Sequence, residues 1–120
     1  MTSASTMHLT QYARVAETVA EIYREHGALD YVEFVGDDMN RECTRSFPDL
    51  VAAADGETIV FGWVVFESRA ARDLVKKKVE ADPRMTDLVA PLINPDDLVF
   101  DSNRMAYGGF QSFVGPRNME

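Results

Sequence analysis

Several residue types that metal and disulfide sites need are nearly absent from this chain of 120 residues. It has one cysteine, Cys43, and two histidines, His8 and His26. A single cysteine excludes a disulfide within the chain and a cysteine-rich zinc site, and it is typical of a reducing compartment. The three residues show no zinc-ligand spacing, and there is no GxGxxG, P-loop or GxSxG motif. We therefore expect no metal, no cofactor and a cytoplasmic protein.

Positive charge and long apolar runs are also scarce. Lys and Arg number 12 against 20 Asp and Glu, which gives a net charge of −8. A protein needs a basic face to bind a phosphate backbone or an anionic lipid surface. We therefore expect neither nucleic acid nor a membrane as partner. The longest apolar stretch, Ile59–Phe66, is far shorter than the roughly 20 residues of a spanning helix. Met1–Thr10 lacks the apolar core of a secretory signal.

Hydrophobic residues are present in the proportion of a globular domain, 46%, and their spacing predicts helices. Apolar residues recur every three or four positions from Leu9 to His26, and Gly27 follows as a helix-ending residue. Ser68 is a candidate N-cap for a helix over Arg69–Ala81. Asp82-Pro83 then predicts the start of a short helix that ends near Ala90.

Three segments are predicted to be strands: Leu29–Val35, Thr58–Phe66 and Met105–Val114. Pro48 is interpreted as a chain breaker, with a short strand over 50–54 after it. Residues 1–120 are predicted to be one domain. Within it, residues 1–8 are an atypical N-terminus and residues 115–120 are a tail. The two long helices can cover only one face of a sheet, yet Thr58–Phe66 is apolar on both faces. A second copy packed sheet to sheet would bury the other face, which predicts a homodimer with a cavity or core between the sheets.

Four motifs occur in order: REHGALDYVE (24–33), ETIVFGWVVFESRAARD (57–73), DPRM (82–85) and RMAYGGFQSFV (104–114). With them the chain resembles the YbaA-like family of small bacterial proteins of unknown function. The resemblance implies an α+β fold, ferredoxin-like with βαββαβ order and an antiparallel sheet, that assembles as a dimeric α+β barrel. That family begins with an apolar strand, whereas only MTSASTMH precedes Leu9 here. We therefore expect the first strand to be short or missing.

Glu33 is the leading candidate for acid/base chemistry because it shares a strand face with Tyr31 and Val35. Burial of that face would make it a candidate general acid or base. The alternative is an edge residue, or an ion pair with Arg84 or Arg104. His26, at the end of the first helix, is interpreted as a helix cap, with a catalytic role near Glu33 as the alternative.

The aromatic residues of the strands are interpreted either as core or dimer interface or as the wall of a pocket for a planar organic ligand. They are Phe61, Trp63, Tyr107 and Phe110. Arg84 either orients an anionic ligand or fixes a helix to a loop.

Two function classes follow from these candidates. In the first, a hydrophobic small molecule is the substrate of a cofactor-free enzyme. Glu33, His26 and Tyr107 are then the acid/base set, and Phe61, Trp63, Phe110 and Arg84 bind the ligand. Acid/base, cyclisation or oxygenation chemistry is implied only by analogy with folds of this kind. In the second class the protein is a non-catalytic homodimer with a binding or structural role, and the same aromatic residues form a packed interface.

Overall fold

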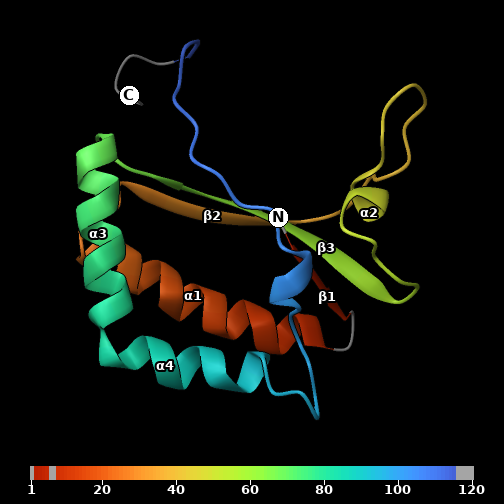
Figure 1. The fold of residues 1–120 in the computed structure, drawn as a ribbon, viewed down its shortest axis with the longest axis horizontal. Helices are drawn as coiled ribbons and strands as arrows, with labels where there is room; N and C mark the ends of the chain where they lie inside the picture. Colours follow the sequence, from red (N-terminus) through yellow and green to blue (C-terminus); the bar gives the residue numbers. More distant parts are fainter. Residues whose placement is uncertain (1, 6–7, 116–120) are drawn as a thin grey trace.

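The computed structural model describes residues 2–5 and 8–115 and has a mixed α+β fold. Its elements follow one another as a strand, a helix, a strand, a short helix, a strand and two further helices, with two 3-10 turns toward the C-terminal end (Figure 1). Their bounds are β1 Thr2–Ser5, α1 Leu9–Glu25, β2 Asp30–Val35, α2 Phe47–Leu50, β3 Glu57–Val65, α3 Arg69–Ala81, α4 Pro83–Val89, η2 Ala90–Leu92 and η3 Ser102–Arg104.

The strands form an antiparallel sheet in the order β1-β3-β2. The short strand β1 pairs along β3, so the expected shortened first strand is present. In the β2–β3 pair, Glu33 lies opposite Gly62 and Phe34 lies opposite Phe61. Because successive side chains of a strand point to opposite faces, Glu33 and Phe34 belong to different faces of the sheet.

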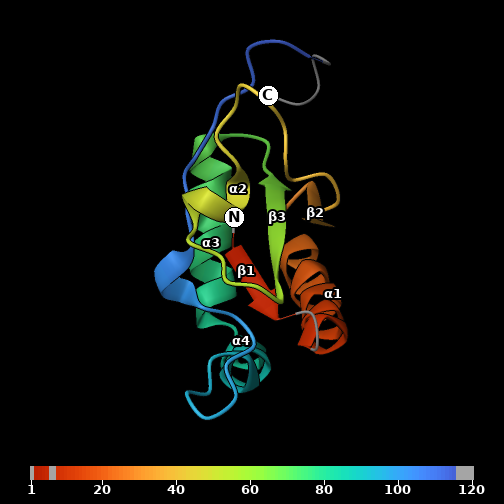
Figure 2. The ribbon, with the colours of Figure 1, turned by 90° about the vertical axis from the view of Figure 1, so that its right-hand side faces the viewer.

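The helices do not cover the two faces of the sheet equally. Helix α1 lies against one face, and α3 stands across the end of the sheet, as Figures 1 and 2 show. The core cluster consists of Ile22, Ala28, Val75 and Val79, where α1, α3 and α4 meet. Among the described residues, none of the helices has the length and apolar composition to cross a bilayer.

The helix boundaries predicted from the sequence are confirmed by their caps. The Ser68 hydroxyl accepts a hydrogen bond from the Ala71 backbone N–H at 3.1 Å, at the start of α3. The Asp82 carboxylate accepts one from the Arg84 backbone N–H at 3.0 Å, at the start of α4. Gly27 has φ +118°, a conformation that L side chains rarely adopt, directly after the end of α1.

The strand predicted over 50–54 is wrong. Helix α2 occupies Phe47–Leu50, with Ser46 as its N-cap and Pro48 in its first turn. Ser46 accepts a hydrogen bond from the Asp49 backbone N–H at 3.2 Å. Proline is compatible with the first turn of a helix because the N–H that it lacks has no intrahelical acceptor there. Pro48 therefore begins an element instead of breaking the chain.

The last predicted strand, Met105–Val114, is also absent as a strand from the described part of the chain. The segment is irregular and follows η3, so the expected βαββαβ order ends without its final strand. A strand needs an edge to pair with, and this segment pairs with neither edge of its own sheet. Residues 116–120 of the predicted tail lie outside the described residues.

Candidate functional site

Glu33 lies on the sheet face that α1 covers, and two tyrosines hydrogen-bond to its carboxylate. The Tyr31 hydroxyl donates to Oε2 at 3.0 Å, and the Tyr12 hydroxyl donates to Oε1. All three side chains are half-buried. Within the described chain no Lys, Arg or His forms an ion pair with Glu33, and the predicted partners Arg84 and Arg104 bind other acids. The carboxylate is thus held by neutral donors only.

Residues of α1, β2 and β3 form this cluster. Tyr31 precedes Glu33 by two residues and shares its face of β2, and Tyr12 belongs to the apolar stripe of α1 that packs on the same face. Gly62, opposite Glu33 on β3, provides the room that the carboxylate needs. A Cβ at Gly62 would lie 3.0 Å from Cγ of Glu33 and 3.4 Å from the Val32 carbonyl oxygen.

The Tyr12–Glu33–Tyr31 cluster lines a groove of about 580 Å³ between α1 and β2. Small side chains of α1 form one wall, which leaves space beside the tyrosines, and the charged side chains of Glu17, Glu21 and Arg24 also border the groove. A largely apolar cleft with a few convergent polar groups is the usual form of a small-molecule site. We call this feature the α1–β2 groove.

Burial stabilises the protonated form of the two tyrosines. It raises the pKa of Tyr12 and that of Tyr31 well above the ordinary value, and the nearby Glu33 carboxylate raises both further. A tyrosine near neutral pH in this site is therefore protonated and donates a hydrogen bond. The arrangement provides one carboxylate acceptor flanked by two fixed O–H donors.

The raised pKa of these tyrosines predicts a loss of stability in alkali. In the unfolded chain tyrosine ionises near pH 10, whereas in the folded chain Tyr12 and Tyr31 keep their protons. The unfolded state then binds fewer protons, so the free energy of unfolding falls as the pH rises above about 10. Urea midpoints at pH 9 and pH 11 should show a smaller fall for the double variant Tyr12→Phe/Tyr31→Phe. An equal fall in both proteins would contradict this assignment.

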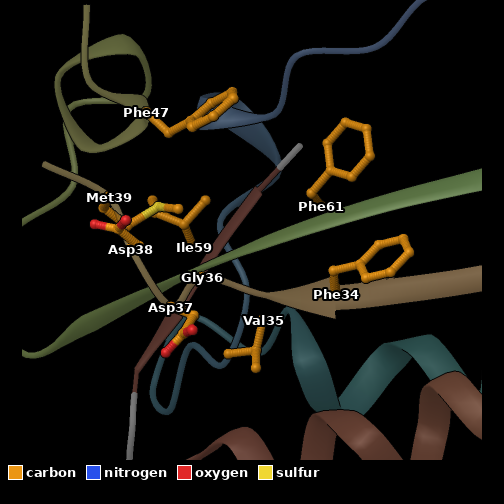
Figure 3. A pocket seen from close by; sticks show the side chains of 9 residues that line it. All are labelled: Phe34, Val35, Gly36, Asp37, Asp38, Met39, Phe47, Ile59 and Phe61. Atoms are coloured by element: carbon orange, nitrogen blue, oxygen red, sulfur yellow. The ribbon is translucent and has the colours of Figure 1, made fainter. Parts of the chain in front are cut away.

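The opposite face of the sheet carries a second apolar surface. Phe34, Phe61 and Trp63 contact one another with ring centroids 5.4–6.2 Å apart. Phe34 and Phe61 also line a hollow of about 380 Å³ that Met39 and Phe47 border. In Figure 3 the rings of Phe34 and Phe61 point to the side of the strands away from the helix. We call Phe34, Phe61 and Trp63 the aromatic face.

His26 and Arg84 lie together, but at the junction of α1 and α4. His26 Nε2 lies 2.9 Å from Oδ2 of Asp82, and Arg84 Nη2 lies 2.7 Å from the same oxygen and 2.7 Å from Oε2 of Glu25. The guanidinium of Arg84 and the imidazole of His26 hold the pKa of Asp82 below its usual range. These contacts connect the end of α1 to the start of α4, which favours the structural interpretation of both residues.

The structure does not bring the predicted acid/base set together. Glu33 contacts Tyr12 and Tyr31, His26 contacts Asp82, and the Tyr107 hydroxyl accepts a hydrogen bond from Lys76 Nζ at 2.8 Å. Phe61 and Trp63 belong to the aromatic face, and Phe110 is almost fully exposed. The predicted ligand-binding residues therefore lie on the other side of the sheet from Glu33 or at its periphery.

Tyr12 is the site residue that the sequence analysis did not single out. Its hydroxyl contacts a residue 21 positions away, which no local pattern reveals. Its place in the apolar stripe of α1 was the available signal, because that stripe had to face the sheet. Among residues 2–5 and 8–115, His, Cys, Asp and Glu form no group of three that could hold a metal ion.

Comparisons with known proteins identify a matching family and several relatives of this chain. A family described as "Protein of unknown function (DUF1428)" matches residues 2–102. The chain is 33% identical to "Uncharacterized protein YbaA" of Escherichia coli K12 over 103 residues, which cover 86% of this chain and 83% of that protein. The protein of the same description from Shigella flexneri shows the same identity and coverage. The described site residues, from Tyr12 to Glu33, lie inside the matched range.

Proposed function

The chain belongs to the DUF1428 family, and we propose that it binds an apolar or aromatic small molecule in the α1–β2 groove and exchanges a proton with it at Glu33. One observation carries this proposal: a half-buried carboxylate that lines an apolar groove and is held by two neutral tyrosine hydroxyls. A structural carboxylate in such a place is ordinarily paired with a cation.

The geometry specifies what the ligand must offer. An ionised carboxylate has about four acceptor positions on its two oxygens. Tyr12 and Tyr31 occupy two of them, which leaves acceptor positions for a donor on the ligand. The ligand therefore combines an apolar ring or chain with an acidic O–H or C–H group.

In the proton exchange, the ligand's proton moves to Oε1 or Oε2 of Glu33, and the electron pair of the broken bond stays on the ligand. Tyr12 and Tyr31 are protonated near neutral pH, and burial raises the pKa of both further, so they position the carboxylate and do not compete for the proton. Ala13, Ala16 and Ala20 of α1 line the groove beside the carboxylate and leave room for the apolar part of the ligand. Return of the proton to another ligand atom would complete an isomerisation or a cyclisation.

Binding of a simple probe tests the proposal. 2-Naphthol has an aromatic body and one acidic hydroxyl, and 2-methoxynaphthalene has nearly the same shape without the donor. Loss of a hydrogen bond to a charged acceptor costs about 1.5–3 kcal/mol. We therefore expect 2-naphthol to bind at least ten times more tightly by fluorescence titration at pH 7. Equal affinities would show that the carboxylate does not contact the ligand.

A second candidate function, a non-catalytic homodimer, is favoured by the aromatic face. Three large aromatic side chains in contact, each more than two-fifths exposed, form an apolar patch of a kind that soluble monomers usually cover. We infer that a second copy covers it, as in the ferredoxin-like dimeric barrel that the resemblance implies. The dimer would cover Phe61 and Trp63, on the face of the sheet opposite Glu33, and Phe34 borders both surfaces, so both proposals are compatible.

A further inference from the structure

The C-terminal segment Met105–Val114 leaves the domain from a fixed point. The guanidinium of Arg104 contacts both carboxylate oxygens of Glu57 at 2.6 Å and the Ala52 carbonyl oxygen at 3.0 Å. It also contacts the carboxylate of Asp101 at 2.9 Å. These bonds attach the start of the segment to the beginning of β3, so the direction in which the chain leaves is defined.

Beyond this anchor the segment has few contacts with its own domain. The Tyr107 hydroxyl bonds to Lys76 on α3, and a Cβ at Gly109 would meet the Arg72 guanidinium. Phe110 and Phe113 are then 97% and 95% exposed. Figures 1 and 2 show the segment extending past the sheet on the side away from α1 and α4. Two fully hydrated phenylalanines in one extended segment indicate a surface that another molecule covers.

The aromatic face lies on this same side of the sheet. Phe34, Phe61 and Trp63 are 44%, 42% and 48% exposed, and their rings already pack against one another. Neither the segment nor the face carries a charge, and both present exposed aromatic side chains. They are therefore complementary to each other, and among the described residues no ring contact joins Phe110 or Phe113 to the aromatic face.

We propose that two copies of this chain exchange their C-terminal segments, so that Phe110 and Phe113 of each copy pack on Phe34, Phe61 and Trp63 of the other. This inference rests on the proposed dimer and adds the segment that crosses and the surface that receives it. Because each copy gives one segment and receives one, the contact is closed by a two-fold axis and needs no third copy.

The segment is long enough for the exchange. The seven residues from Gly108 to Val114 span roughly 23 Å when extended, at about 3.3 Å per residue. Facing sheets pack about 10 Å apart. The segment can therefore cross to the second sheet and still follow it for several residues.

The apolar area is that of a stable dimer. An aromatic side chain buries about 150–250 Å². Two nearly exposed phenylalanines and half of three further aromatic side chains thus provide roughly 700 Å² in each copy, or about 1,400 Å² in the pair. Specific interfaces bury about 1,200–2,000 Å². The net charge of −8 on each copy opposes association, so the uncharged aromatic surfaces must supply the attraction.

Isotope-mixed photocrosslinking distinguishes exchange between copies from contact within one copy. Phe110 is replaced by p-benzoylphenylalanine, an aromatic side chain that crosslinks its neighbours under ultraviolet light. Unlabelled and ¹⁵N-labelled proteins are unfolded together, refolded, irradiated and digested. We expect crosslinked peptides that join position 110 to β2 or β3 and carry one label from each protein. Crosslinks between peptides of one label only would overturn the exchange while leaving the dimer in place.

Light scattering tests the dimer on which the exchange depends. At micromolar concentration we expect twice the chain mass of 13.4 kDa, and a single chain mass would overturn both the dimer and the exchange. The variant Phe110→Ser/Phe113→Ser should raise the dissociation constant at least a hundredfold. The matched control Leu74→Ser/Leu98→Ser removes two exposed side chains elsewhere and should leave it within threefold. Equal effects in the two variants would contradict a specific role for the segment. None of these outcomes depends on ligand binding.

Discussion

Replacement of Glu33 by glutamine is expected to weaken 2-naphthol binding at least tenfold. Glutamine keeps the shape of the side chain but removes the charge and converts one acceptor oxygen into a donor. The Tyr12 and Tyr31 hydroxyls both donate to this group, so one of them would have to turn its O–H away and accept from the amide NH2. A hydrogen bond to a charged group contributes about 1.5–3 kcal/mol, and 1.4 kcal/mol corresponds to a factor of ten.

The matched control for this variant is Glu17→Gln. Glu17 lines the same groove and is exposed on α1, and its replacement changes the net charge by the same amount. We expect its affinity to stay within twofold of the unaltered protein. If both variants weakened binding equally, the effect would come from the charge of the groove as a whole and not from contact with Glu33. Circular dichroism of both variants checks that the fold is kept.

Replacement of Ile22 by alanine is expected to destabilise the fold by about 3 kcal/mol. Ile22 is fully buried where α1 meets α3 and α4, in the cluster that contains Val75 and Val79. An Ile→Ala change in a core costs about 2–5 kcal/mol because it removes buried methyl groups and leaves a cavity. The free energy of unfolding in urea measures the effect.

The exposed Leu74 on α3 provides the comparison for Ile22. Leu74→Ala should cost less than about 1 kcal/mol, since surface changes of this kind remove little buried area. Similar costs for the two variants would place the core elsewhere than at the junction of α1, α3 and α4. The core and the α1–β2 groove lie on the same side of the sheet. The affinity for 2-naphthol is therefore also measured for Ile22→Ala and Leu74→Ala.

Sequence patterns predicted the elements whose determinants are local. Ser68 and Asp82 begin helices because their side chains accept from N–H groups two or three residues ahead, and Gly27 ends one because its φ is positive. Pro48 has two opposite meanings, breaker or first-turn residue, and only Ser46 as N-cap decides between them. A proline alone does not show which of these two meanings applies.

Features that depend on residues far away in the sequence, or on a strand edge to pair with, could not be predicted from local patterns. The Tyr31–Glu33 contact follows from strand alternation, whereas the Tyr12–Glu33 contact depends on how α1 crosses the sheet. Met105–Val114 has the composition of a strand, but a strand also requires an edge. In the described chain no edge pairs with it, and composition alone does not reveal where such an edge lies.

The central claim is that the α1–β2 groove, and not the aromatic face, holds the ligand. A crystal structure after soaking with 2-naphthol tests it most directly, because Glu33 lies on one face of the sheet and Phe61 and Trp63 lie on the other. We predict the naphthol ring in the groove, with its hydroxyl within hydrogen-bond distance of a Glu33 carboxylate oxygen. A naphthol ring stacked on Phe61 or Trp63, with the groove empty, would contradict the claim.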